Sequence, residues 1–485
     1  MIRAAQVVAG IIVLLAVVGF GAPARAEVTL AAATADAGGG WEVYTTGRVG
    51  AFVEVLEGDG IPQAFAVAVD PTTMMPVLDA NGNPMYVQIH NVGDGGVRAG
   101  PSDPKVQPDG SSGQGHLGVS RVVSGFLPNI LGIGLRRKVT DRVKVDAFIS
   151  SWATAETINR RTFVAKNPDI REAYGKLEGP WGSLLVGRAL SLFGRGTVEI
   201  DFLYGHGYGV GQPGGFDEQG PSGGHIGYGI VAPFFVSGVV YATPKLHGLQ
   251  LTAGYFDPAA LVGLYWVRTK YGRPEAELAY DFDSGALKLH LYASGAWQRL
   301  YSANVLQDAA GNNLDVQPSA DVLGGAGGAR IEVGHLHLGV AGHRGRGLGV
   351  AYFLDGSDAN FAKDTTHELR TFSGAYVQAQ VVAGKFDLNG GWGMTWIDPL
   401  PADTNPNWCG TGTFAMPCGG FSNASGVIRP ASSILKSQMG ISGVVVYHFT
   451  PSVHFAADYF FSDVKWMQGE KQIVHSFALG TTITW

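Results

Sequence analysis

Apolar and polar residues alternate with a period of two along much of this chain. The last segment shows the pattern clearly, with apolar side chains on one face at Phe477, Leu479, Ile483 and Trp485. Stretches 287–298, 386–396 and 453–461 repeat it. Because successive side chains of a strand point to opposite faces, this period predicts β-strands, whereas a helix would mix the two sets.

The connections between these segments come in two lengths. Tight turns at 140–141, 283–285, 384–385 and 450–452 alternate with long polar stretches around 57–115, 190–230, 301–325 and 398–430. A soluble sandwich also alternates, but short turns at one rim and long loops at the other are typical of an outer-membrane barrel. The polar faces, rich in Gly, Ser, Thr and single charges, fit a water-filled interior.

Sixteen strands are expected along the chain. They begin near 41, 116, 142, 168, 182, 231, 249, 271, 286, 326, 335, 370, 385, 433, 452 and 470. An antiparallel barrel of this size leaves an aqueous channel, and its closure removes edges that lipid cannot hydrogen-bond. Aromatic girdles are predicted at the periplasmic rim (Trp41, Tyr447, Phe449, Trp485) and the outer rim (Trp297, Trp396, Tyr459, Phe461).

The N-terminus adds an export signal to this organisation. Arg3 precedes an apolar run over 7–20, and the segment closes on Ala24, Arg25 and Ala26. The run is shorter than the roughly 20 residues that span a bilayer, so it is interpreted as a cleaved signal over 1–26 rather than an anchor. The remaining residues, 27–485, are expected to form one transmembrane barrel domain.

Composition narrows the function classes. The chain has 72 Gly among 485 residues, only 15% charged residues and a net charge of −6, which gives no indication of nucleic-acid binding. Cys409 and Cys418 lie in a stretch rich in Pro, Gly and Asn of an exported chain, so a local disulfide is expected, with free thiols or a metal pair as alternatives.

Other constellations give weaker indications of chemistry. His335, His337 and His343 could hold a transition metal, but imidazoles lining the interior are the preferred interpretation. The acids at 355, 358 and 364 lack the order of an EF-hand loop. No G-x-S-x-G elbow is present, and the hypothesis assigns no enzymatic activity, no cofactor and no metal.

Several motifs resemble the general trimeric porins of Gram-negative bacteria. They are Thr46-Gly47-Arg48, Ser120-Arg121, Ile170-Arg171-Glu172-Ala173-Tyr174 and the run from Gly179-Pro180-Trp181 to Gly187-Arg188. The resemblance implies that the third long loop folds into the barrel. It also implies a constriction with a basic wall of Arg48, Arg121 and Arg171, facing loop carboxylates at Asp217 and Glu218, with Glu199 and Asp201 next.

These expectations combine into a functional hypothesis. The chain is predicted to lie in the outer membrane in contact with lipid, to assemble as a homotrimer, and to let ions and small hydrophilic solutes diffuse passively. One alternative is a channel selective for a sugar, phosphate or another nutrient. The other is a surface adhesin or structural barrel that conducts nothing.

Overall fold

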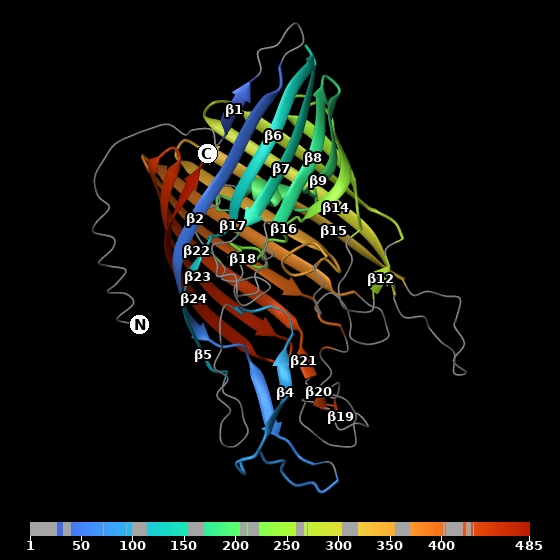
Figure 1. Cartoon of the computed structure of the whole chain (residues 1–485), viewed down its shortest axis with the longest axis vertical. Coiled ribbons are helices and arrows are strands. Elements are labelled where there is room, and N and C mark those ends of the chain that lie inside the picture. Colours follow the sequence, from blue (N-terminus) through green and yellow to red (C-terminus); the bar gives the residue numbers. More distant parts are fainter. Residues whose placement is uncertain are drawn as a thin grey trace.

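The computed structural model describes residues 27–32, 40–70, 72–93, 95–98, 114–153, 169–203, 211, 223–258, 266–268, 270–302, 319–354, 369–400, 403, 421–422, 428–429 and 431–485. Within these ranges the chain forms a closed antiparallel β-barrel (Figure 1). No helix of the described residues is long and apolar enough to cross a membrane. The predicted signal segment 1–26 and both cysteines lie outside the described residues.

Sixteen strand positions form the ring, as the sequence predicted. In ring order they are β2 (Glu42–Asp59), the interrupted strand β5 (His116–Val123) and β6 (Asn129–Thr140), β7 (Val143–Ala153), β8 (Asp169–Gly179), β9 (Gly182–Leu190), β10 (Phe235–Ala242), β11 (Leu249–Phe256), β13 (Arg273–Asp283), β14 (Leu287–Ser302), β15 (Ser319–Val333), β16 (Leu336–Arg346), β17 (Thr371–Ala383), β18 (Phe386–Ile397), β22 (Leu435–Thr450), β23 (Val453–Trp466) and β24 (Lys471–Thr484).

Closure joins the two ends of the chain. β24 pairs with β2 in antiparallel register, with Arg48 opposite Thr484, and the amide of Gly47 donates to the carbonyl of Trp485 at 2.9 Å. The short strand β1 (Val28–Ala32) pairs with β2 from Glu42 to Thr45, just beyond the end of β24. The first and last strands of the ring, β2 and β24, therefore meet at one seam.

Short turns and long connections fall at opposite rims. β6 and β7, β15 and β16, β17 and β18, and β22 and β23 are each separated by two residues, which defines the turn rim. The loop rim carries β3 (Gln63–Val67), β4 (Tyr86–Val92) and β21 (Ala431–Ser433), which form a small sheet, together with β12 (Trp266–Arg268), β19 (Phe421–Ser422) and β20 (Ile428–Arg429). Figure 1 shows β4 and β21 beyond the barrel strands.

Some strand limits differ from the sequence prediction. The second strand is interrupted over 124–128, where Pro128 cannot donate to the ladder. The tenth begins at Ser319 instead of 326, because its Gly-rich part pairs along β14 without a visible period of apolar side chains. Tyr459 lies in mid-strand, opposite Gly443 and Phe477, so its assignment to the outer girdle is wrong.

The outer and inner faces of the wall have opposite polarity. Along β2, Val53 is 54% exposed, whereas the neighbouring carboxylate Glu54 is completely buried. Exposed Val, Leu and Ile recur around the ring, for example Leu338 on β16 and Val377 on β17, while buried Gln378 and Gln380 face inward. This inverted pattern is that of a wall with lipid outside and polar groups inside.

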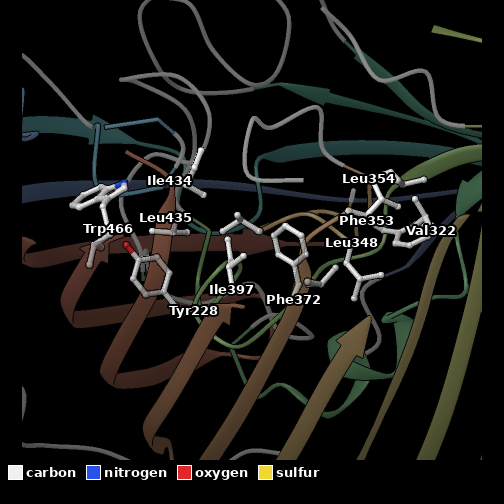
Figure 2. Packing of buried hydrophobic residues seen from close by; sticks show 14 of the residues in the cluster. Tyr228, Val322, Leu348, Phe353, Leu354, Phe372, Ile397, Ile434, Leu435 and Trp466 are labelled. Carbon is white, nitrogen blue, oxygen red and sulfur yellow. The ribbon is translucent and has the colours of Figure 1, made fainter. Parts of the chain in front are cut away.

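Part of the interior near the loop rim is packed with apolar side chains. Connecting segments supply Tyr228, Leu348 and Phe353, which belong to one buried cluster with the wall residues Phe372 and Trp466. Figure 2 shows these residues gathered between the ribbon of the wall and the loops. The cluster holds loop segments inside the ring and narrows the space available there.

The lipid-facing assignment predicts a specific mutant phenotype. Val377→Arg should lower the free energy of unfolding by about 2–4 kcal/mol, because a charge in mid-strand on this face enters hydrocarbon. Val377→Met should change it much less, since an apolar side chain is retained. Urea unfolding in lipid vesicles would measure both values, and equal stability of the two variants would contradict the assignment.

Candidate functional site

The connection between β9 and β10 folds into the barrel and is called here the inner loop, described over 191–203, Gly211 and 223–234. Its short helix α2 (Arg195–Ile200) lies against β14, β15 and β16. Its later part reaches β18, β22 and β23, where Tyr228 Oη is 2.7 Å from Ser462 Oγ and the amide of Gly229 donates to Thr395 Oγ1. The predicted in-folded third loop is therefore confirmed.

Two glycines permit the close approach of the inner loop to the wall. Gly229 has φ of 100°, and a Cβ there would lie 2.2 Å from the carbonyl oxygen of Ala375. A Cβ at Gly393, on the wall itself, would lie 1.9 Å from the carbonyl oxygen of Tyr228. Backbone therefore packs directly on backbone at both positions, which only glycine allows.

Acidic residues on β13 hold the beginning of the inner loop. Glu275 Oε2 accepts hydrogen bonds from the amides of Leu192 and Phe193, each at 2.7 Å, and its Oε1 accepts from Arg273 Nε at 2.6 Å. Two residues further along the same face, Glu277 pairs with Arg195 of α2. Because Arg273 and Glu275 are almost completely buried, this ion pair fixes where the loop enters the interior.

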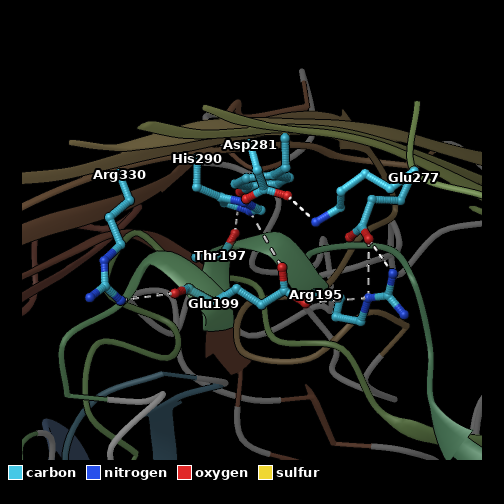
Figure 3. Close-up of polar contacts among 9 residues, drawn as sticks. Arg195, Thr197, Glu199, Glu277, Asp281, His290 and Arg330 are labelled. Atoms are coloured by element: carbon cyan, nitrogen blue, oxygen red, sulfur yellow. Dashed lines mark hydrogen bonds and ion pairs between the residues drawn. The ribbon is translucent and has the colours of Figure 1, made fainter. Parts of the chain in front are cut away.

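The helix α2 carries a charged group that remains accessible inside the barrel. The Glu199 side chain is 46% exposed, and its Oε2 lies 3.4 Å from His290 Nε2. His290 Nδ1 lies 2.7 Å from Asp281 Oδ1, and Asp281 Oδ2 accepts from Lys245 Nζ at 2.7 Å. Figure 3 shows His290 between Asp281 and Glu199, with Arg195 and Glu277 beside them and Arg330 on the other side of the helix.

The two predicted wall residues Arg48 and Arg121 both face inward. Arg48, on β2, is 6% exposed. Arg121, on β5, has its Nε 2.5 Å from Glu54 Oε2, so a neighbouring carboxylate offsets much of its charge. In a ring of sixteen, the strand opposite β2 is β14, against which α2 packs. The topology thus places Arg48 and Arg121 on the wall that faces α2.

Arg171 occupies a different place. It lies near the loop rim on β8, where its Nε is 2.9 Å from Asp169 and its guanidinium lies over the ring of Trp152. A β-bulge opposite Ser150 and Ser151 makes Arg171 the extra residue between Ile170 and Glu172. In a regular strand, one of the neighbours Arg171 and Glu172 would point towards lipid. The bulge allows both side chains to avoid it.

The predicted acidic residues lie in different environments. Asp201 is completely buried, where it accepts from Tyr376 Oη at 3.0 Å and from the amide of Leu203, so it anchors the inner loop instead of meeting solvent. Glu199 is the accessible carboxylate. Asp217 and Glu218 lie outside the described residues.

Sequence reasoning missed the groups that contact the inner loop from the opposite wall. They are Glu275, Glu277, His290 and Arg330, with Asp281 and Lys245 behind His290. The spacing of Arg273, Glu275 and Glu277 on one face of a strand was a visible signal. What it could not show is that the inner loop folds back onto that face. Among the described residues, no group of three or more His, Cys, Asp or Glu is placed to hold a metal ion.

Comparisons with known proteins identify the architecture. No protein-family model matches the sequence, and no curated protein matches it. The outer membrane channel DcaP of Acinetobacter baumannii superposes with a TM-score of 0.57, covering 94% of this chain and 100% of that chain at 14% identity. An anion-selective porin from Comamonas acidovorans gives 0.50, covering 92% and 100% at 13% identity. The chain therefore has the porin fold.

Removing the carboxylate that holds the inner loop should destabilise the folded barrel. Glu275→Ala should lower the free energy of unfolding by about 3–5 kcal/mol, because Arg273 would be left as a buried, unpaired charge. Urea unfolding in vesicles would measure this change. Asp321→Ala, which breaks an exposed pair with Arg299, serves as control and should lower the free energy of unfolding far less, because water screens this pair. A comparable loss in both variants would contradict the anchoring role.

Proposed function

We propose that this protein is an outer-membrane channel through which ions and small hydrophilic solutes diffuse passively. The observation that carries the proposal is a closed barrel whose outer face is apolar and whose inner wall is polar. An accessible carboxylate, Glu199, lies inside that ring on the inner loop. The porin fold shared with DcaP and the Comamonas porin supports the same conclusion.

The physical mechanism is electrostatic filtering without any covalent step. Charged side chains on opposed surfaces of a narrow passage create a field across it, which orients dipolar solutes and favours ions of one sign. In this proposal Arg48 and Arg121 supply the basic wall, and Glu199, Asp217 and Glu218 supply carboxylates on the inner loop. Residues 1–26 serve as the export signal, and the mature barrel assembles as a homotrimer.

A substrate-selective channel is the second candidate. The apolar cluster around Phe353, Phe372 and Trp466 fills part of the interior near the loop rim, so the passage there is narrower than the ring of strands. A narrow passage gives one solute more contacts with the wall than an open pore does. Saturable flux would support this candidate over general diffusion.

Conductance of the purified protein tests the proposal directly. The folded mature barrel in a planar bilayer should give stable, ohmic single-channel steps in KCl. Concentration-dependent block by one added sugar or by phosphate would instead support the selective channel. Silence from barrels that are verified as folded would contradict both and would favour a surface-binding function.

Charge reversal on the inner loop tests the proposed constriction. Asp217→Lys combined with Glu218→Lys should shift the reversal potential in a KCl gradient towards anion preference, because two negative charges become positive in the passage. The matched control makes the same change at Asp70 and Asp79, which lie in the exposed first loop. Equal shifts in both double variants would exclude a local role for 217 and 218.

A further inference from the structure

We infer that His290 is a positioning residue that couples the ion preference of the channel to pH by holding Glu199 at the wall. The inference rests on the proposed channel function and deepens it. His290 lies on the inner face of β14, one-fifth exposed, with one ring nitrogen directed at each of two carboxylates. One carboxylate belongs to the wall and the other to α2, so the imidazole bridges the inner loop and the barrel.

The two contacts of His290 differ in kind. Nδ1 is at hydrogen-bonding distance from Asp281 Oδ1, 2.7 Å, which fixes the plane and direction of the ring. Nε2 lies 3.4 Å from Glu199 Oε2, a separation at which charge attraction matters more than hydrogen-bond direction. Only a doubly protonated ring presents a proton and a positive charge to both partners. The link to α2 therefore depends on the charge of the imidazole.

Two basic groups near His290 have carboxylates other than Glu199 as their main partners. On α2, Arg195 is directed to Glu277 of β13 and lies 3.9 Å from Glu199. Lys245, from the connection between β10 and β11, is bound to the far oxygen of Asp281. Histidine is the residue type that ordinarily titrates near neutrality.

The remaining charged neighbours are also held in place. From β15, Arg330 is paired with Glu332 and donates to the backbone carbonyl of Glu199, not to its carboxylate. On β14 itself, Lys288 shares the inner face with His290 and lies opposite Asp283 of β13 in the strand register. Neither group is directed at the Glu199 carboxylate, so neither can replace His290 as the link between that carboxylate and the wall.

The sign of the effect follows from these pairings. While the imidazole is protonated and both carboxylates are ionised, the cation lies between two anions and holds α2. As pH rises through the imidazole titration, one positive charge disappears from the interior, and Glu199 loses its ion pair with the wall while keeping the longer contact with Arg195 on its own helix. The channel should therefore become more cation-preferring as pH rises, and α2 should be less firmly held.

Two substitutions mimic the two charge states. His290→Lys keeps a positive charge throughout the range, whereas His290→Gln keeps a polar side chain that never carries one. In a KCl gradient, the reversal potential of the wild-type channel should match His290→Lys at pH 5.5 and His290→Gln at pH 8.5. Each variant should itself vary little over that range.

Two further variants separate this role from a merely structural one. Glu199→Gln removes the carboxylate that His290 holds, so the pH shift in reversal potential should become smaller, leaving only the part due to the imidazole charge itself. His454→Gln alters another buried inner-wall histidine, one that pairs with His448 near the turn rim, and should keep the wild-type pH dependence.

The outcomes are distinguishable. Folding of each variant is checked first by its resistance to denaturation in detergent gels. Conducting His290→Gln channels that keep the full wild-type pH shift would overturn the inference and leave the channel function intact. The inference would also be overturned if His454→Gln lost the pH shift in reversal potential while His290→Gln kept it. Folded barrels that are silent at every pH would overturn the proposed function, and the inference with it.

Discussion

The hydrogen bonding of the backbone in lipid is the constraint on which the rest of this structure depends. Hydrocarbon offers no partner for an amide or a carbonyl, so every strand that faces it must be paired on both sides. The ring from β2 to β24 satisfies this requirement through antiparallel ladders, with β24 returning to β2. The hydrocarbon outside also accounts for the exposed Val and Leu on the outer face, while the inner wall is polar because it faces the interior.

A closed ring of this size creates a second problem, because its interior is too wide for wall side chains alone to fill. The chain solves it with connecting segments that fold inward. The inner loop begins on the Arg273–Glu275 pair of β13 and crosses the interior to β18 and β23. Close to the loop rim it joins the apolar cluster of Figure 2. The interior therefore combines a packed region with a charged region around Glu199, and the second is where selectivity is proposed to arise.

The sequence was sufficient for the repeating part of the fold and insufficient for the contacts across the barrel. Period-two alternation and connection lengths predicted sixteen strands, because lipid outside and polar groups inside impose that period directly on each strand. The bulge at Arg171 was not predictable, since it shifts the register by one residue without a Gly or Pro to mark it. Asp201 and Glu199 look equivalent in sequence, yet one is buried beneath Tyr376 and the other meets solvent. That difference depends on which strands lie opposite the loop, which local pattern does not encode.

The seam between the ends of the chain has a kinetic consequence. Gln472 of β24 donates to the carbonyl of Asp59 on β2, a contact between residues 413 positions apart. Most ladders in the barrel join consecutive strands and can form locally, but this one must wait until the last strand is present. Because contacts distant in sequence slow folding, ring closure is expected to limit the rate of assembly. Until then both edges of the sheet remain unpaired, so the nascent barrel has a period of vulnerability to aggregation that the finished one lacks.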